Sequence, residues 1–363
     1  MSRVVVIGGS GHVGAYLLPA LVERGHNVIN VSRGQTKRYR HDAAWNAIEQ
    51  VVVVRTVEEN GGTFGSTVAA LRPDIVVDMI SFKLSSTQSL VEALSGKVEH
   101  FLHCSTIWVF GHNAAVPVGE DDPLNPFGEY GINKAAIETW LLHEARQTGF
   151  PATIFRPGHI VGPGWAPINP VGHLNTEVFS CIARNEEVTL PNFGLETLHH
   201  VHAHDVAQMI LLAIDNRSAS LGEAFNAVSA KALNLRGYAE AMFRWFGFEP
   251  KLRFEPFEIW KVRHSPEDAQ LAWEHISRQL VHVHRQGTSA PRLQATLLKL
   301  GCSTGGGFRF DRCRQGSGTE KLAGVMVHAR RRIHQSQFAR FLCLKQFRQI
   351  NGKIGKASEN GFR

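Results

Sequence analysis

The sequence predicts an α/β protein built on a doubly wound parallel sheet, followed by a smaller lobe. Short, fully apolar runs alternate with amphipathic helical stretches through the first 156 residues. This alternation is typical of parallel strands that are covered by helices on both faces. A glycine-rich turn also joins the first apolar run directly to the first helical stretch, at residues 8–14. These two observations place the chain among open α/β folds, which bind ligands at the carboxyl edge of the sheet.

The elements are expected in the order of a Rossmann-type domain over residues 1–156. The clearest helical patterns in it are Val13–Arg24 and Ala135–Arg146. The predicted strands are the apolar runs Arg3–Ile7, Val28–Val31, Val51–Val54, Ile75–Ile80, His100–Cys104 and Ala152–Phe155.

Residues 157–278 show a looser pattern, with glycine- and proline-rich loops between three expected helices. These helices are Thr176–Asn185, Asp205–Asp215 and Leu235–Phe246. We interpret this stretch as a substrate-binding lobe that is interleaved with the last elements of the sheet and packs at its carboxyl edge.

The glycine turn reads GGSGHVG and is expected to bind the phosphates of a dinucleotide. Its glycines would permit the tight turn, the approach of a pyrophosphate to the backbone, and the close packing of helix on strand. The N-terminus of the following helix offers unpaired N–H groups for the phosphates. The residues expected to bind the cofactor in this turn are Gly8, Ser10, Gly11, His12, Val13 and Gly14.

The end of the second strand favours NADP(H) over NAD(H) as the cofactor. Enzymes that use NAD commonly place an acidic residue there to bind the adenosine ribose, but this chain has Arg33, followed by Lys37, Arg38 and Arg40. A guanidinium pairs well with a 2′-phosphate. A solvated basic loop without a ligand is the alternative interpretation.

A Tyr-x-x-x-Lys pair provides the candidate catalytic group. Tyr130 and Lys134 are four residues apart at the start of an expected helix and would share one face of it. A nearby ammonium favours the phenolate and lowers the pKa of a tyrosine, which would make Tyr130 a usable proton acceptor near neutral pH. Thr106 follows a buried strand, and its hydroxyl can orient a substrate oxygen.

With these motifs the chain resembles the extended short-chain dehydrogenases/reductases of the NAD-dependent epimerase/dehydratase family. The matching segments cover about residues 1–278 and are GGSGHVG at 8–14, STIWVFG at 105–111, YGINK at 130–134, RPGHIVGPG at 156–164 and HHVHAHDVA at 199–207. The resemblance implies that Thr106, Tyr130 and Lys134 are catalytic, that Lys134 also holds the nicotinamide ribose, and that Pro157 contacts the cofactor.

Two departures from the family pattern narrow the expected activity. The 4,6-dehydratases of the family have Asp-Glu after the catalytic threonine, whereas this chain has Ile107 and Trp108, so dehydration by that route is not expected. Many nucleotide-sugar enzymes have an asparagine two residues after the Arg-Pro pair, where this chain has His159. A nucleotide-sugar substrate is therefore in doubt.

A metal site could be suggested by four histidines that precede or adjoin Asp205, namely His199, His200, His202 and His204. His200, His202 and His204 would share one face if the segment were extended, and Asp205 stands where a helix N-cap is expected. Because the family pattern accounts for the segment without a metal, we expect these side chains to be structural or to line the substrate site, and we predict no metal. Five scattered cysteines, Cys104, Cys181, Cys302, Cys313 and Cys343, suit a reducing compartment.

Residues 279–363 differ from the rest of the chain. They contain 16 Lys and Arg against 3 Asp and Glu, while the first 278 residues contain 23 against 29. The helix, LLGYxP turn and final helix that the family would continue with do not appear here. A shift of one nucleotide in the reading frame permits SSCMSIGKARRLLGYKPRYSSLDAV from residue 279. We interpret this irregular basic tail as out-of-frame translation; a nucleic-acid-binding arm is the alternative.

The sequence thus predicts an NAD(P)-dependent oxidoreductase or epimerase that acts on a hydroxyl or ketone carbon of a small polar, sugar-like substrate. The alternative is a non-catalytic dinucleotide- or RNA-binding protein of the same fold. We expect a cytoplasmic protein, because the N-terminus leads directly into a strand and no run of about 18 apolar residues is present. Nucleic acid and membranes are not expected partners. A homodimer could form through Ile137, Trp140, Leu141 and Leu142, although these side chains could equally face the domain's own sheet.

Overall fold

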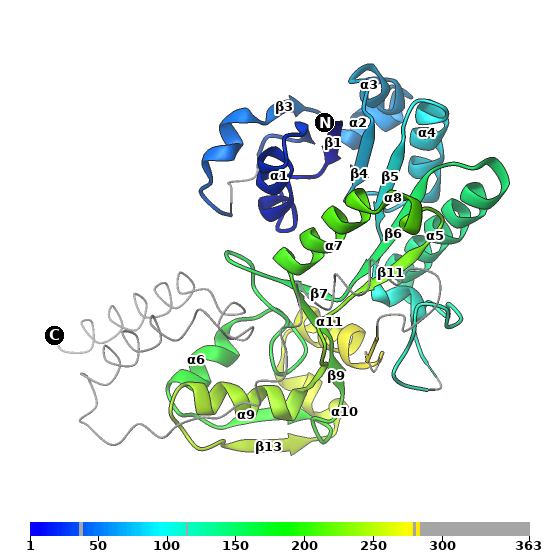
Figure 1. Cartoon of the computed structure of the whole chain (residues 1–363). Helices are drawn as coiled ribbons and strands as arrows, with labels where there is room; N and C mark the ends of the chain where they lie inside the picture. The colour runs from blue at the N-terminus through cyan, green and yellow to red at the C-terminus, as the bar shows by residue number, and fades with distance from the viewer. Residues whose placement is uncertain (36–38, 114, 279–280, 284–363) are drawn as a thin grey trace.

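The computed structural model describes residues 1–35, 39–113, 115–278 and 281–283. A seven-stranded sheet has the order β11-β6-β5-β4-β1-β2-β3, and every neighbouring pair in it is parallel. The predicted Rossmann-type fold is therefore confirmed (Figure 1). The strands are β1 (Arg3–Ile7), β2 (Asn27–Ser32), β3 (Glu49–Val52), β4 (Ile75–Asp78), β5 (His100–Cys104), β6 (Ala152–Pro157) and β11 (Ala224–Ala227).

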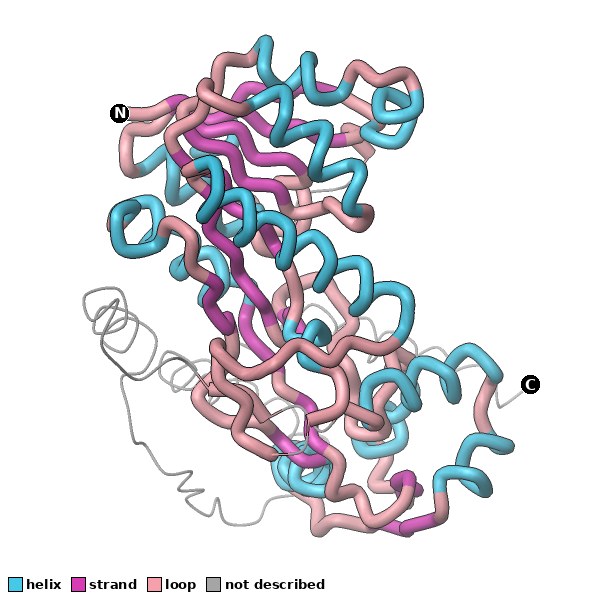
Figure 2. Tube along the Cα trace, turned by 90° about the vertical axis from the view of Figure 1, so that its right-hand side faces the viewer, coloured by secondary structure: helices cyan, strands magenta, loops and turns pink. Residues whose placement is uncertain are grey.

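Helices cover both faces of this sheet (Figure 2), because the side chains of its central strands are apolar on both sides. On one face, α1 (Gly14–Glu23) and α7 (Ala203–Asp215) share a buried cluster with β1 and β4. On the other face, α3 (Phe64–Ala70), α4 (Leu84–Leu94) and α5 (Gly128–Thr148) pack on β1, β4 and β5. The short helices α2 (Arg55–Asn60) and α8 (Arg217–Ser220) lie in connections.

The edge strand β3 differs from its predicted position. The apolar run predicted a strand over Val51–Val54, but the ladder with β2 covers Glu49–Val52. Val52 is 69% exposed, since an edge strand has only one neighbour and needs no continuous apolar run. Hydrophobic periodicity therefore located this strand two residues too late.

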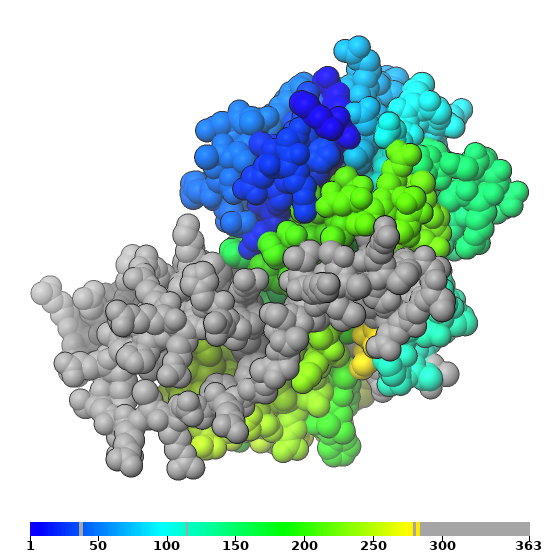
Figure 3. Space-filling model, in the orientation of Figure 1, coloured from blue at the N-terminus to red at the C-terminus, as the bar shows by residue number. Residues whose placement is uncertain are grey.

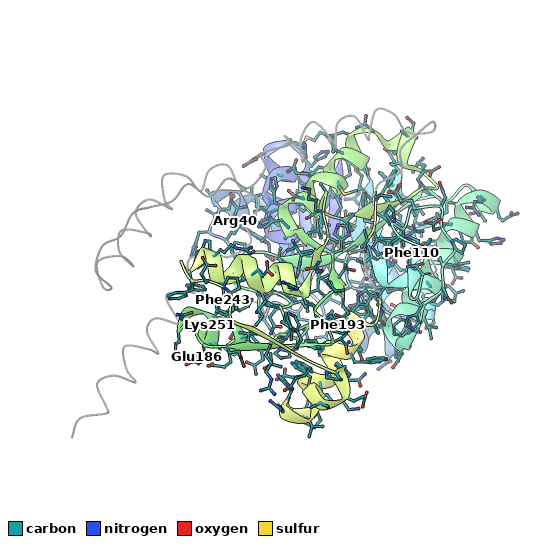
Figure 4. All side chains as sticks on the ribbon, turned by 90° about the horizontal axis from the view of Figure 1, so that it is seen from below. Arg40, Phe110, Glu186, Phe193, Phe243 and Lys251 are labelled. Carbon is teal, nitrogen blue, oxygen red and sulfur yellow. The ribbon has the colours of Figure 1, made fainter. Side chains whose placement is uncertain are left out.

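The smaller lobe lies beyond the carboxyl ends of the main strands (Figures 1 and 3). Its core surrounds Phe243 and Trp260, neither of which is exposed; Figure 4 labels Phe243 there, with Glu186, Phe193 and Lys251 in the same lobe. It has three strand pairs, β7 (His159–Val161) with β10 (His200–His202), β8 (Val188–Pro191) with β13 (Leu252–Glu255), and β9 (Thr197–Leu198) with β12 (Leu233–Asn234). Its helices are α6 (Glu177–Ala183), α9 (Leu235–Trp245), α10 (Phe257–Trp260) and α11 (Pro266–Ile276).

The chain passes between the two parts more than once. After β7 it enters the smaller lobe, and it returns to the main sheet through α7 and β11 before it leaves again. Residues 281–283 pair with Val118, whose N–H donates to the Val281 carbonyl at 2.8 Å. The other residues of the predicted basic tail, with Cys302, Cys313 and Cys343, lie outside the described residues. Within the described residues, no helix is both long and apolar enough to cross a membrane.

Candidate functional site

The glycine turn lies between β1 and α1, at the carboxyl edge of the sheet. Gly8 has a φ of +84°, and a Cβ there would lie 2.7 Å from a side-chain carbon of Ile80. A Cβ at Gly14 would lie 1.9 Å from the carbonyl oxygen of Gly9, so the helix can pack this closely only without a side chain. A Cβ at Gly11 would make only an ordinary contact of 3.5 Å with Gly8. Internal packing therefore does not require glycine at Gly11, whereas the approach of a pyrophosphate to the backbone would.

The side chains of Ser10, His12 and Val13 in the turn contact other residues of the protein. The Ser10 hydroxyl accepts a hydrogen bond from Asn30 Nδ2 at 3.0 Å, and Val13 belongs to the core. The His12 ring lies 4.4 Å from Tyr39 and 4.1 Å from Trp165, centroid to centroid, and burial lowers its pKa to about 4. Contacts of His12 and Val13 with phosphate would thus come from their backbone N–H groups, whereas the Ser10 hydroxyl, which only accepts from Asn30, can still donate its proton.

Arg33 is exposed just beyond the end of β2. The structure gives it no ion pair among the described residues, so its guanidinium is available to a ligand. Arg40 is different, because its guanidinium carbon lies 4.3 Å from the centroid of the Tyr16 ring. Lys37 and Arg38 fall outside the described residues.

The residues Thr106, Tyr130 and Lys134 come together where β5 ends and α5 begins. Helix α5 starts at Gly128, so Tyr130 and Lys134 lie on its first two turns, at the start of the helix as predicted. Lys134 is 1% exposed, and its ammonium donates to the Cys104 carbonyl at 2.6 Å. Thr106 caps a 3₁₀ turn, with its hydroxyl accepting from the Trp108 N–H at 3.2 Å.

The electrostatics of this group differ from the expectation. Burial raises the pKa of Tyr130, and a hydrogen bond with Thr106 acts in the opposite direction. The residue as a whole is 41% exposed, but its hydroxyl end points into the protein. Burial likewise lowers the pKa of Lys134. The Lys134 ammonium donates to the Cys104 carbonyl, and a tyrosine hydroxyl whose pKa is raised is protonated near neutral pH.

A buried ion pair fixes α5 against the strands beside it. Glu138, one turn after Lys134, accepts hydrogen bonds from Arg156 on β6, including one from Arg156 Nε at 2.9 Å. Its second oxygen accepts from the Ser105 hydroxyl at 3.0 Å. Ser105 immediately precedes Thr106, so this network positions the threonine and the tyrosine relative to each other. Pro157 follows Arg156 at the end of β6 and is buried.

A cavity of about 480 Å³ opens beside Tyr130, between the start of α5 and α11. Its walls contain aromatic and charged side chains, and Trp108 contacts both Tyr130 and Arg278. The indole lies 5.6 Å from the Tyr130 ring, centroid to centroid, and 3.8 Å from the guanidinium carbon of Arg278. The side chains that form the walls include Phe82, Lys83, Trp108, Phe127, Glu129, Tyr130, Trp273, Glu274 and Arg278.

The histidine segment is arranged differently from the prediction. Only His200–His202 is extended, as β10, and His204 lies on α7, so the three histidines do not share one strand face. His202, not Asp205, caps α7, with its ring accepting from the His204 N–H at 3.1 Å. Among the described residues, no group of three or more His, Cys, Asp or Glu could hold a metal ion. The segment builds a helix start instead.

Ile137 and Leu141, proposed for a dimer contact, are fully buried in the protein's own core. Trp140 and Leu142 are partly buried against the same core. The alternative that these side chains face the domain's own sheet is therefore the one that the structure supports.

Sequence reasoning missed three residues of this region. Trp108 was noted only as a departure from the dehydratase pattern, and Glu138 and Arg278 were not singled out. Glu138 could have been found, because it lies four residues after Lys134 on the same helix face. Nothing local marks Arg278, which reaches the cavity only through the packing of α11.

A parallel sheet of this order, with a glycine turn that leads into its first helix, defines a dinucleotide-binding α/β protein. The chain matches the model of the NAD dependent epimerase/dehydratase family over residues 4–227 and belongs to that family. The resemblance inferred from the motifs is thus confirmed.

Individual relatives differ in activity. The chain is 25% identical over 265 residues to the chloroplast stem-loop binding protein of 41 kDa b from Arabidopsis thaliana, covering 71% of this chain and 67% of that protein. It is 32% identical over 136 residues to 2′-dehydrokanamycin reductase from Streptomyces kanamyceticus, covering 38% of this chain and 36% of the reductase. The crystal structure of UDP-glucose 4-epimerase from Thermotoga maritima, with UDP-glucose, has the same fold, with a TM-score of 0.56 and 22% identity over 70% of this chain and 85% of that one.

Proposed function

We propose that the protein is an NAD(P)-dependent oxidoreductase or epimerase that acts on a hydroxyl or ketone carbon of a small, sugar-like substrate. The observation that carries the proposal is the meeting of Thr106, Tyr130 and Lys134 beside a cavity at the carboxyl edge of a dinucleotide-binding sheet. The nicotinamide ring of the cofactor would accept or donate the hydride. The names of the relatives above, a sugar-nucleotide epimerase and an aminoglycoside reductase, support a sugar-like substrate.

In the proposed mechanism, Tyr130 exchanges a proton with the substrate oxygen and Thr106 orients that oxygen. Because burial raises the pKa of Tyr130, its hydroxyl starts as a proton donor, which suits reduction of a ketone. For the reverse direction the phenol must lose its proton. Lys134 would favour this by turning its ammonium from the Cys104 carbonyl towards Tyr130 and the cofactor ribose.

The glycine turn is proposed to hold the pyrophosphate, and Pro157 to contact the cofactor at the end of β6. Arg33 is proposed to bind a 2′-phosphate, which favours NADP(H). A 4,6-dehydratase activity is not proposed, because Ile107 and Trp108 supply neither a carboxylic acid nor a base next to Thr106. The proposed division into a cofactor domain (1–156) and a substrate lobe (157–278) follows the same assignment.

Replacing Tyr130 by Phe tests the mechanism. We expect Tyr130→Phe to lose at least about a hundredfold in turnover, since general acid–base catalysis typically contributes 10²–10⁴-fold, and to bind cofactor as the wild type does. Turnover is followed by nicotinamide absorbance, and epimer formation by chromatography, on a panel of nucleotide sugars and aminoglycosides. Cofactor affinity is measured by fluorescence titration with the four forms NAD+, NADH, NADP+ and NADPH.

Thr106 offers a matched pair of control variants. Thr106→Ser keeps the hydroxyl and is expected to keep most of the activity, while Thr106→Val has nearly the same shape and is expected to lose it. Full activity of Tyr130→Phe, or binding of none of the four cofactor forms, would contradict the proposal.

A second candidate function is non-catalytic binding of dinucleotide or RNA. The name of the Arabidopsis relative, which describes binding of a stem-loop, is the observation that favours it. The presence of Thr106, Tyr130 and Lys134 together argues against it, since a pure binding protein has no need of all three. Salt-dependent binding of an RNA hairpin, combined with full retention of that binding in Tyr130→Phe, would support this candidate.

A further inference from the structure

Three arginines are buried among the described residues, and one of them has no carboxylate partner. Arg55 is 8% exposed and pairs with Asp78 at 2.7 Å, and Arg156 is 3% exposed and pairs with Glu138. Arg278 is 2% exposed, but the structure gives it no ion pair with any described carboxylate. A buried cation without a partner carries a large desolvation cost, so Arg278 requires an explanation that the other two do not.

Aromatic rings pack against the guanidinium of Arg278, but no described carboxylate balances its charge. The guanidinium carbon lies 3.8 Å from the centroid of the Trp108 ring and 3.9 Å from that of Phe127. Arg278 donates to two main-chain carbonyls, those of Phe127 at 3.1 Å and of Glu274, while its Nε has no partner among the described residues. Burial lowers the pKa of this guanidinium to about 10.

The nearest acidic side chain does not neutralise Arg278. Glu274 lies one turn earlier on α11, but its carboxylate accepts a hydrogen bond from Gln270 at 3.0 Å. No salt bridge joins it to the guanidinium among the described residues, although its charge does favour the protonated form.

Arg278 lies in the wall of the cavity that also contains Tyr130. At about 480 Å³ the cavity is large enough for a ligand of monosaccharide size. Trp108 contacts both residues, so a ligand group near Arg278 and a reacting carbon near Tyr130 belong to one pocket.

We propose that Arg278 is a specificity residue that recognises an anionic group, a carboxylate or a phosphate ester, on the substrate. The proposal rests on the proposed function and adds the substrate class: an acidic sugar or sugar phosphate rather than a neutral sugar. An anion in the cavity supplies the partner that Arg278 lacks, and the two flanking rings hold the guanidinium plane in a fixed orientation for it. The same wall contains Lys83, and it also contains the carboxylates Glu129 and Glu274.

Three probes that share one ring test this proposal: D-glucose, D-glucuronate and D-glucose 6-phosphate. Binding to the full chain, saturated with cofactor, is measured by calorimetry at constant ionic strength. We expect the wild type to bind at least one of the two anions about tenfold or more tightly than glucose, because a hydrogen bond to a charged group is worth that much. The stronger of the two anions identifies whether a carboxylate or a phosphate is the natural group.

Four variants complete the experiment. Arg278→Gln is expected to bind anion and glucose alike, and Arg278→Lys to retain part of the preference. Arg236→Gln, which removes an exposed arginine of the same lobe, serves as the matched control and is expected to keep the preference of the wild type. Glu274→Gln removes the competing charge and is expected to increase anion affinity.

Equal affinity of the wild type for all three probes would overturn the proposal even if Arg278→Gln failed to fold, and so would an undiminished preference in Arg278→Gln. Cofactor binding, measured on the same samples, distinguishes a failure of the Arg278 proposal from a failure of the proposed function. Loss of anion preference with intact cofactor binding supports Arg278, whereas absence of cofactor binding in the wild type contradicts the proposed function itself.

Discussion

At the scale of single residues, the position of the Lys134 ammonium decides how Tyr130 can act. With the Lys134 ammonium bonded to the Cys104 carbonyl, the pKa of Tyr130 is raised, mainly by burial and also by the Cys104 side chain. The Tyr-x-x-x-Lys spacing correctly predicted that both side chains lie on one helix face, but not the carbonyl that competes for the ammonium. The Cys104 carbonyl lies at the end of β5, 30 residues before Lys134 in the chain. Only the tertiary structure shows that it reaches the ammonium.

Arg33 leads to a prediction about cofactor choice. Because Arg33 is exposed at the end of β2 and no described carboxylate pairs with it, its guanidinium can bind a 2′-phosphate without first breaking an ion pair. Arg33→Ser is expected to weaken NADPH binding about tenfold or more and to leave NADH binding unchanged. Fluorescence titration with both cofactors measures the ratio. Arg146→Ser, at the far end of α5, is the control; an equal loss for NADH and NADPH would show that Arg33 does not read the 2′-position.

At the scale of elements, the strands buried in the centre of the sheet were predicted best. Residues Arg3–Ile7 and His100–Cys104 were placed without error, since central parallel strands are apolar on every face. The predicted bounds of an element were wrong where the element is held by its neighbours in the fold and not by the burial of its own apolar side chains. β3 lies at an edge. The start of α5 was predicted at Tyr130 by the Tyr-x-x-x-Lys motif, and the two residues before it, Gly128 and Glu129, were missed because they carry no apolar signal.

The contact between α5 and β6 depends on the buried pair of Glu138 and Arg156. Neither side chain is more than 4% exposed, so Glu138→Gln leaves an unpaired buried cation and is expected to cost about 3–5 kcal/mol of unfolding free energy. Urea unfolding measures the change. The pair of Arg236 and Glu240, whose side chains are 55% and 22% exposed, is the control, and Glu240→Gln is expected to cost at most about 1 kcal/mol. Similar costs for both variants would mean that the buried pair is not a support of the α5 contact.

At the scale of the whole molecule, the candidate site combines residues from the main sheet and from the smaller lobe, between which the chain passes more than once. Thr106, Tyr130 and Lys134 come from the elements of the main sheet, while Arg278 lies two residues beyond the end of α11 in the smaller lobe. The sequence predicted the first set because each residue belongs to a short motif. It could not predict the second, since no local pattern indicates which helix of a lobe with mixed structure reaches the cavity.

Buried histidines make the whole fold sensitive to acid. Burial is the largest cause that lowers the pKa to about 4 in His12, His100, His173 and His275, and to about 3 in His103, His200 and His282. The unfolded chain takes up these protons near pH 6.5, so it binds more protons than the native state below that pH. Stability is therefore fully present above about pH 6.5 and is lost as the pH falls towards these native pKa values.

At pH 5 each such histidine costs up to about 2 kcal/mol, and a typical domain has only about 5–15 kcal/mol in total. We therefore expect unfolding of the whole chain between about pH 6 and pH 4, measured by circular dichroism with urea titrations at each pH. His100→Gln can still bond to Thr153, which His100 Nε2 meets at 2.8 Å, and is expected to move the midpoint to lower pH. His143→Gln, on the exposed side of α5, is expected to leave it in place. A free energy of unfolding that stays constant from pH 7 to pH 5 would mean that these rings are accessible to protons in the native state, and that the packing around them is looser than the structure describes.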